Sequence, residues 1–211
     1  MLGRTEKEYN QALPPMTPID IQSLESAFRG ELFRPGDAGY DQARRIWNAS
    51  VDKHPAVIAR CAGVTDIVSA VRFAREKNLL TAIRGGGHNV GGRALCDDGI
   101  VIDLSLMRSV HVDPRNRAVR VQGGALLEDL DRETHAFGLG VPSGVVSKTG
   151  IAGLTLGGGV GWLVRKYGMS IDNLLSCQVV TAEGKILETD ASENEDLFWA
   201  LLNSREFAFN H

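Results

Sequence analysis

The residues best suited to chemistry lie in one short stretch, 83–92 (IRGGGHNVGG), which holds five of the chain's 24 glycines together with Arg84 and His88. Glycines contribute no side-chain packing and lose much entropy on folding, so this density is expected where the backbone itself meets a ligand. Backbone N–H groups in such a loop can form a concave cradle for an anion. His88 stands at the end of the cradle, where it can touch the ligand. The alternative is a flexible surface turn, but turns seldom need five glycines.

A second glycine-rich stretch runs from Gly144 to Gly161 and contains seven glycines in eighteen residues. An ordinary helix is not expected there, because each interior glycine costs a helix about 1 kcal/mol. Residues 157–161 do not complete a dinucleotide-binding fingerprint, since no apolar strand leads directly into them and no acidic strand end follows about twenty residues later. No Gly-Lys-Ser or Gly-Lys-Thr of a P-loop occurs. The two glycine stretches are too far apart to be one motif, but they could converge on one long ligand, one holding its charged middle and the other a flat ring.

The remaining histidines and the cysteines do not indicate a second reactive centre. The histidines interpreted as structural are His54, His111 and His135. The three cysteines are an odd number without metal-ligand spacing, so we expect reduced thiols and no metal site. Cys61 and Cys177 lie in apolar runs and are expected in the core. Cys96 lies near the glycine loop but has no partner that would make it a nucleophile.

Composition limits the classes of function. With 211 residues, 22.8 kDa and 43% hydrophobic residues, the chain can form one large domain or two small ones with a genuine core. A net charge of −3, a pI near 6.0 and the lack of a basic stripe argue against a nucleic-acid partner. No apolar run approaches the ~20 residues that span a bilayer, and residues 1–7 lack the apolar segment of a secretory signal. We therefore expect a cytoplasmic protein that does not bind membranes.

The elements that position the first glycine loop are expected to alternate between strand and helix. The loop should directly follow an apolar strand, 79–83, so that its backbone starts from a fixed point. A polar tail, 1–16, should precede a first helix that Thr17 caps and Gly30 ends, followed by a loop through residue 48. The other elements expected in this small α/β unit are a strand at 56–61, a helix at 66–77 capped by Thr65, and a strand at 99–104.

The second half is expected to contain more strand. Residues 110–112 and 118–122 flank a turn that is typical of a hairpin. An amphipathic helix should follow at 125–137, and a further hairpin at 174–187. Asn194 can cap a last helix, whose apolar face carries Leu197, Phe198 and Leu201, whereas residues 205–211 show no pattern.

Five blocks, taken in order, resemble the PCMH-type flavin-binding domain of the vanillyl-alcohol oxidase superfamily, most closely the berberine-bridge-enzyme-like oxidases. The likeness covers roughly residues 47–200. It implies an α+β, two-subdomain FAD-binding fold. The blocks are AIRGGGHN (82–89), GIVIDLS (99–105), VQGGA (121–125), GLTLGGGVG (153–161), and DNL (172–174) leading to VVTAEG (179–184).

The resemblance implies FAD as the cofactor and gives the blocks their roles. The loop 84–89 would wrap the FAD pyrophosphate with backbone N–H groups. In the family the histidine that matches His88 is bonded through a ring nitrogen to the 8α-methyl carbon of the flavin, a reaction that a neutral imidazole can perform. Members with a second attachment use a cysteine where this chain has Val146, so we expect single attachment. The cofactor-binding residues implied are Arg84, Gly85, Gly86, Gly87, His88, Asn89, Asp103, Ser105, Gly123, Gly144, Thr149, Gly153, Gly157, Gly158, Gly161 and Val179.

The chain departs from the family pattern near its end. Members continue with a further glycine run and an Asn-Phe-Gly motif, whereas this chain reads LLNSREF at 201–207. We therefore expect a truncated or frame-shifted member that lacks the C-terminal substrate domain and the catalytic base. The expected parts are a tail and helix (1–50), a first FAD-binding subdomain (51–105), a second (106–204) and an atypical end (205–211).

The sequence leaves two main hypotheses for function. The first is the FAD-binding portion of an oxidoreductase that transfers hydride from an alcohol, sugar or amine, its small-molecule substrate, to flavin N5. The second is a non-catalytic remnant that binds FAD weakly or not at all. An NAD-dependent dehydrogenase is disfavoured because the dinucleotide fingerprint is incomplete. No residue is nominated as the catalytic base.

Overall fold

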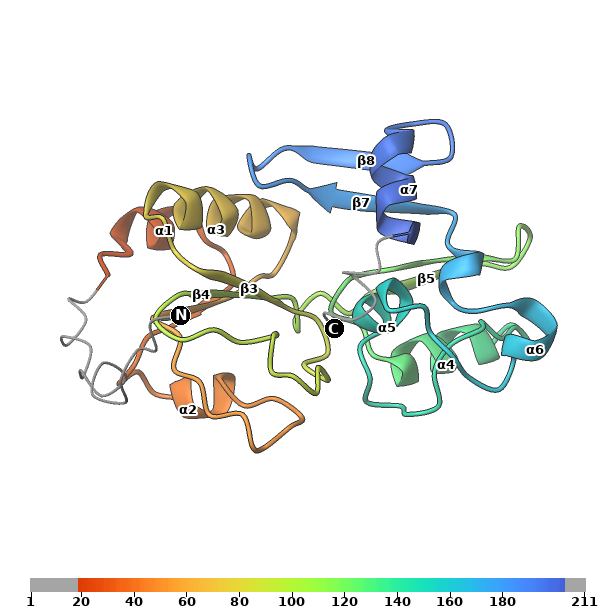
Figure 1. Ribbon diagram of the computed structural model, residues 1–211, viewed down its shortest axis with the longest axis horizontal. Helices are drawn as coiled ribbons and strands as arrows, with labels where there is room; N and C mark the ends of the chain where they lie inside the picture. The colour runs from red at the N-terminus through yellow and green to blue at the C-terminus, as the bar shows by residue number, and fades with distance from the viewer. Residues whose placement is uncertain (1–18, 204–211) are drawn as a thin grey trace, which may run out of the picture.

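The computed structural model describes residues 19–203 (Figure 1). Within this range the first half of the chain forms a four-stranded sheet with its helices, and the second half forms two hairpins with short helices. The expected tail at 1–16, the Thr17 cap and the unusual ending at 205–211 lie outside the described residues.

The sheet brings charged residues to one edge. Its strand order is β1-β2-β4-β3, with β2, β4 and β3 parallel and β1 antiparallel to β2. The parallel register sets Arg60 and Arg84 on either side of Asp103, at the carboxyl ends of three neighbouring strands. Ligands of open parallel sheets bind at this kind of edge. The strands are β1 (Glu31–Phe33), β2 (Val57–Arg60), β3 (Thr81–Arg84) and β4 (Ile100–Asp103).

Helices cover both faces of this sheet. α1 (Gln22–Ala27) and α3 (Val64–Glu76) lie on one face, and α2 (Tyr40–Ala43) lies on the other (Figure 1). Alternate residues of β2 face opposite sides, so Val57 packs with the α1–α3 core and Ile58 with the α2 core. Burial on both faces explains why the two central strands, β2 and β4, read as continuous apolar runs, whereas the edge strand β3 exposes alternate residues.

The second half surrounds a smaller apolar cluster of Ala125, Leu127, Leu130 and Ile151. The side chains of Val110, Val119 and Val121 from the first hairpin pack against this cluster. The elements here are β5 (Val110–Asp113), β6 (Ala118–Val121), α4 (Leu127–His135), α5 (Ile151–Leu156), α6 (Val164–Tyr167), a 3₁₀ turn (Ile171–Asn173), β7 (Ser176–Val180), β8 (Ile186–Asp190) and α7 (Glu195–Asn203).

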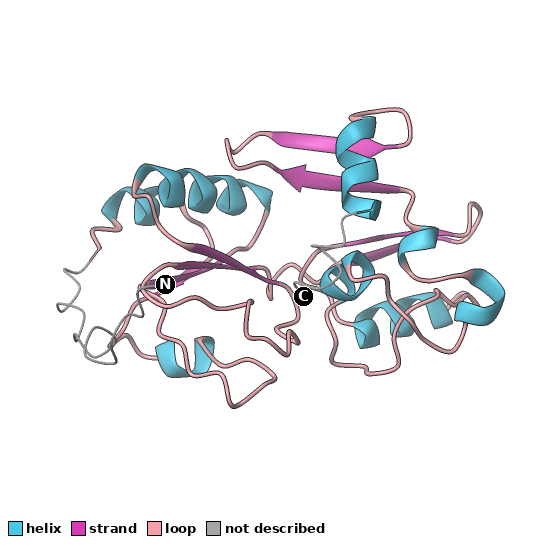
Figure 2. Ribbon diagram, in the orientation of Figure 1, coloured by secondary structure: helices cyan, strands magenta, loops and turns pink. Residues whose placement is uncertain are grey.

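Most of the elements expected from the sequence are confirmed. The strands expected at 56–61, 79–83 and 99–104 are β2, β3 and β4, the helix expected at 66–77 is α3, and both hairpins form. Residues 85–99, which contain the glycine loop, hold neither helix nor strand (Figure 2). The loop therefore leaves β3 directly, as the alternation predicted.

Other expectations were wrong. The first helix begins at Gln22 rather than beside Pro18, and Gly63 rather than Thr65 precedes α3. The segment expected to be a loop contains β1 and α2, which are too short to leave a periodic pattern. α5 forms inside the second glycine stretch because its six residues include a single glycine, Gly153.

Candidate functional site

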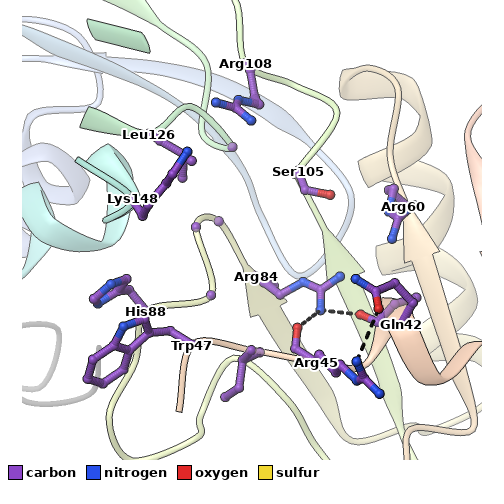
Figure 3. Close-up of a pocket in the computed structure, with 16 residues that line it drawn as sticks. Gln42, Arg45, Trp47, Arg60, Arg84, His88, Ser105, Arg108, Leu126 and Lys148 are labelled. Carbon is purple, nitrogen blue, oxygen red and sulfur yellow. Dashed lines mark hydrogen bonds between the residues drawn. The ribbon is translucent and has the colours of Figure 1, made fainter. Parts of the chain in front are cut away.

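A cleft of about 440 Å³ opens at the carboxyl end of the parallel strands (Figure 3). The glycine loop forms part of its wall, and residues from before β2, after β4 and before α5 complete it. Its lining residues are Gln42, Ala43, Arg45, Ile46, Trp47, Arg60, Arg84, Gly85, Gly86, Gly87, His88, Ser105, Arg108, Gly124, Leu126 and Lys148.

A buried ion pair closes the base of the cleft. Asp103 is fully buried and accepts hydrogen bonds from the guanidinium groups of Arg84 and, at 3.1 Å, Arg60. Ser105 adds two more, from its backbone N–H and its hydroxyl, each 3.0 Å long. Burial alone would raise the pKa of Asp103, but the hydrogen bond and charge of Arg84 outweigh it and hold that pKa below its ordinary value. The carboxylate therefore stays ionised and fixes both arginines.

The arginine of the glycine loop also holds a neighbouring segment. Arg84 is 6% exposed, and its Nη1 donates to the backbone carbonyls of Ala43 and Arg45. These bonds attach the end of α2 and the residues just after it to the end of β3. Because the guanidinium of Arg84 already has these partners, its first role in this structure is to set the shape of the loop.

The two glycine stretches meet backbone to backbone. A Cβ at Gly86 would lie 2.4 Å from the backbone nitrogen of Gly150, and one at Gly85 would lie 2.8 Å from the carbonyl oxygen of Gly123. Real Cβ atoms do not approach backbone this closely, so these positions need glycine. Gly87 has φ +66°, a conformation that side chains other than glycine rarely adopt. The glycines thus let the loop pack directly against other backbone in the wall of the cleft.

His88 lies on the face of an aromatic ring. The rings of His88 and Trp47 stack with centroids 4.5 Å apart and planes 21° from parallel. The backbone N–H of Trp47 donates to the carbonyl of Gly87 at 3.0 Å. Nε2 of His88 is buried and has no hydrogen-bond partner among the described residues. A buried polar nitrogen without a partner is uncommon and indicates that a further group meets it.

Basic side chains line the cleft. Its lining includes Arg45, Arg60, Arg84, Arg108 and Lys148 and no carboxylate. Figure 3 shows Arg108 and Lys148 on one side of the cleft and the other three arginines across from them. An anion held between these two sides would be attracted from both.

Four of these cations are partly neutralised by acidic residues behind the lining. Arg60 and Arg84 bind Asp103, and Arg108 binds Asp129. Lys148 donates to Glu128 at 2.8 Å. The hydrogen bond from Arg108 holds the pKa of Asp129 below its ordinary value. Within residues 19–203, Arg45 forms no ion pair, and its guanidinium makes one 3.5 Å hydrogen bond, to Gln42.

The structure brings together only part of the residue set implied by the sequence. The residues of that set that line the cleft are Arg84, Gly85, Gly86, Gly87, His88 and Ser105. Asp103 lies beneath them, and the carbonyl of Gly123 lies against Gly85. Thr149 borders the site between Lys148 and Gly150, and its carbonyl accepts a hydrogen bond from the N–H of Leu127.

The other implied residues do not line this cleft. Asn89 accepts a hydrogen bond from the backbone of Arg93 and so holds the far end of the loop. Gly144 approaches the side chain of Leu154, and Gly161 lies against the carbonyl of Ser143, so these two glycines allow two chain segments to pack closely. The rest are Gly153 in α5, Gly157 at its end, Gly158 with φ +100° and Val179 in β7.

The sequence did not single out Trp47, Arg45, Arg108 or Lys148, all of which line the cleft. Trp47 and Arg45 precede the glycine loop by some forty residues, and only the contacts of Arg84 and Gly87 bring them to it. The sequence signal for these two residues is the run of basic and aromatic residues at 44–47.

The cysteines offer no nucleophile or metal site. Burial raises the pKa of Cys61 to about 12 and that of Cys96 to about 11, so both stay as thiols near neutral pH. Burial also raises the pKa of Cys177. Cys177 is half-buried rather than in the core, and Val146 is exposed. The described residues contain no cluster of histidine, cysteine and acidic side chains that could hold a metal ion, and no helix among them is long and apolar enough to cross a membrane.

Comparison with known proteins places these features in context. Residues 55–190 match the family model described as "FAD binding domain". The chain is 40% identical over 185 residues to (R)-6-hydroxynicotine oxidase of Paenarthrobacter nicotinovorans, covering 88% of this chain and 39% of that protein.

Solved structures of FAD-dependent oxidases resemble this chain as well. The structure of 6-hydroxy-D-nicotine oxidase from Arthrobacter nicotinovorans superposes with a TM-score of 0.82 at 40% identity, over 84% of this chain and 39% of that one. Glucooligosaccharide oxidase from Acremonium strictum, described with a 6-S-cysteinyl, 8α-N1-histidyl FAD, gives a TM-score of 0.77 at 31% identity, over 85% and 38% of the two chains. The chain thus spans about two fifths of the length of these relatives.

Proposed function

Because this chain belongs to the FAD-binding domain family found in FAD-linked oxidoreductases, we propose that its cleft holds FAD for the oxidation of an alcohol, sugar or amine. The observation that carries the proposal is the meeting of the two glycine stretches beside a buried, unpartnered histidine nitrogen. The relatives are longer than the matched part, so substrate oxidation is proposed for the whole protein.

The residues of the cleft fit the diphosphate of FAD. The lack of side chains at Gly85 and Gly86 lets the loop pack against the backbone of Gly123 and Gly150, which sets the path of the main chain whose N–H groups would meet an anion. Five basic side chains line the cleft and no carboxylate does. The Asp103 carboxylate belongs to the base of the cleft and is satisfied by Arg60, Arg84 and Ser105, so it does not oppose the ligand's charge.

We further propose that His88 is the attachment residue for the flavin. Its unpartnered nitrogen is a nucleophile when the imidazole is neutral. Attachment would exchange the N–H hydrogen of the imidazole and one hydrogen of the flavin 8α-methyl group for the new N–C bond. The two hydrogens and two electrons released would pass to dioxygen, giving hydrogen peroxide. Val146 and the buried, protonated cysteines support a single bond rather than two.

The division of labour follows from the side chains present. FAD supplies the acceptor for a hydride, and the protein supplies binding and orientation. The described residues around the cleft bind an anion and fix a ring, but none is a carboxylate suited to take a substrate proton. We therefore assign binding and attachment to this domain and assign no catalytic base within it.

FAD uptake tests the proposal. The purified chain is mixed with FAD, separated from free ligand by gel filtration, and its visible spectrum is read on the protein peak. We expect a flavin spectrum that excess NAD does not remove, because NAD lacks the flavin ring. A colourless protein that elutes as a folded monomer or oligomer would overturn the proposal and favour the non-binding alternative.

A further inference from the structure

We propose that Trp47 is a positioning residue for His88, and that its indole sets the plane of the imidazole for attachment to the flavin. This inference rests on the proposed function, because it takes His88 as the attachment residue and concerns only how fast the bond to the flavin forms. It is carried by the ring stacking, the lack of any other group that orients His88, and the way in which the chain holds Trp47.

The stacking is a face-to-face contact at close range. The ring centroids of Trp47 and His88 are 4.5 Å apart, with a 21° angle between planes. Aromatic pairs at this separation favour an offset-stacked arrangement. Rotation of the imidazole away from this plane would lose the contact, so the indole restricts the ring to one plane.

A hydrogen bond usually performs this task. A functional histidine is generally oriented by a bond from its second ring nitrogen to a carbonyl or carboxylate. Among the described residues, the His88 side chain makes no hydrogen bond, and its Nε2 is buried without a partner. The Trp47 ring is therefore the contact that fixes the imidazole plane while a ring nitrogen stays available.

The chain holds Trp47 firmly to the loop that it supports. Its backbone N–H donates to the Gly87 carbonyl at 3.0 Å, and the amide of Asn48 donates to the Val90 carbonyl at 2.8 Å. On the other side, Arg84 binds the carbonyls of Ala43 and Arg45. The segment before and after Trp47 is thus tied to the backbone on both sides of His88.

The exposure of Trp47 is otherwise unexplained. Trp47 is 60% exposed to solvent, although a tryptophan is usually placed where most of its surface is covered. Both rings line the cleft, and Figure 3 shows them together on the same side of it. A large aromatic residue held in the open beside the attachment residue has a role there rather than in the core.

The step affected is the bond described above, in which a ring nitrogen of His88 replaces one hydrogen of the flavin methyl group and dioxygen finally takes the electrons. The rate of attachment is read from a time course. After the unliganded chain and FAD are mixed in air, samples are precipitated with acid, and the fraction of flavin that stays with the protein is followed over time. Trp47→Leu keeps apolar bulk without a ring, and Trp47→Phe keeps a ring. Phe137→Leu, a change at an exposed aromatic residue outside the cleft, is the matched control.

We expect Trp47→Leu to slow attachment at least tenfold, within the ~100-fold cost of a 1 Å misplacement. Trp47→Phe should restore most of the rate, and Phe137→Leu should match the wild type. FAD retained without a covalent bond should match the wild type in Phe137→Leu, and the attachment rate of each Trp47 variant is compared per FAD retained, because Trp47 itself lines the cleft. A wild-type rate in Trp47→Leu overturns the positioning role, whereas a wild type that forms no acid-stable flavin overturns the attachment itself.

A spectroscopic measurement covers the case of a variant that does not fold. Circular dichroism identifies that case, and Trp47→Met then provides a second ring-free side chain. In the unliganded wild type, the indole should shift the His88 ring-proton resonances upfield, and Trp47→Phe should reduce the shift while Phe137→Leu leaves it in place. His88 resonances at random-coil positions in the wild type would overturn the stacking and the proposal with it.

Discussion

Gly86 and Gly150 lie so close that a Cβ built on either would come within 2.4 Å of the other's backbone nitrogen. This contact joins the loop after β3 to the start of α5, and with it the two glycine-rich stretches of the sequence. The wall of the cleft is therefore a single packed surface made from two distant parts of the chain. Any side chain at either position must push these parts apart.

Gly86→Ala should lower the free energy of unfolding by about 1–3 kcal/mol, the usual cost of overpacking a close contact. It should also reduce FAD retention, because the loop backbone moves. Urea unfolding followed by circular dichroism measures the first effect. Gly153→Ala is a control of opposite sign: nothing lies within 4 Å of its added Cβ, and alanine favours the α5 helix. Equal stability of Gly86→Ala and wild type would show that the two backbones are not in contact.

The buried pair at the base of the cleft predicts a larger effect. Asp103→Asn leaves Arg84 without a carboxylate and Arg60 with Glu31 alone, and breaking a buried ion pair typically costs about 3–5 kcal/mol. The urea midpoint should fall accordingly. Glu133→Gln breaks the exposed Arg132 pair, so no resolvable change is expected in that control. If both substitutions have the same small effect, Asp103 does not organise the strand ends.

The same carboxylate predicts a pH dependence. Its folded-state pKa is lower than the ordinary value, so its contribution to stability is fully present above about pH 4, the ordinary pKa of aspartate. The contribution is lost as the pH falls through the lower, folded-state value. The stability difference between wild type and Asp103→Asn should therefore shrink below about pH 4. Urea midpoints measured from neutral to acidic pH test this, and a difference that grows on acidification would contradict the sign.

The sequence predicted the strand, the loop and the histidine because each is a local feature. An apolar run leads into Arg84, glycines follow, and His88 ends them, so periodicity and composition were sufficient. The environment of these residues is not local. Arg84 and Asp103 face each other because β3 and β4 are neighbours in register, and Trp47 reaches His88 through a loop contact. Such placements depend on how the sheet is ordered, which no pattern within one segment records.

Arg45 offers a test of the charge in the cleft. Since it makes no ion pair within the described part of the chain, Arg45→Gln should leave the urea midpoint unchanged and weaken FAD binding by a few-fold. The loss should be smaller at high salt, because screening shortens the reach of the charge to ~3 Å at 1 M ionic strength. Fluorescence titration with FAD measures it. Arg132→Gln, an exposed change outside the cleft, should have no effect on affinity, and equal affinities for both variants would show that Arg45 does not face the ligand.

The central claim is that this domain holds FAD through His88, and the mass of the intact protein tests it most directly. After incubation with FAD in air and denaturation, the wild-type chain should be heavier by one covalently bound FAD, and proteolytic fragments should place the addition on the peptide that contains His88. His88→Ala should have the unmodified mass while still retaining flavin in its native state. A wild-type chain of unmodified mass, or an addition that persists in His88→Ala, would contradict the account.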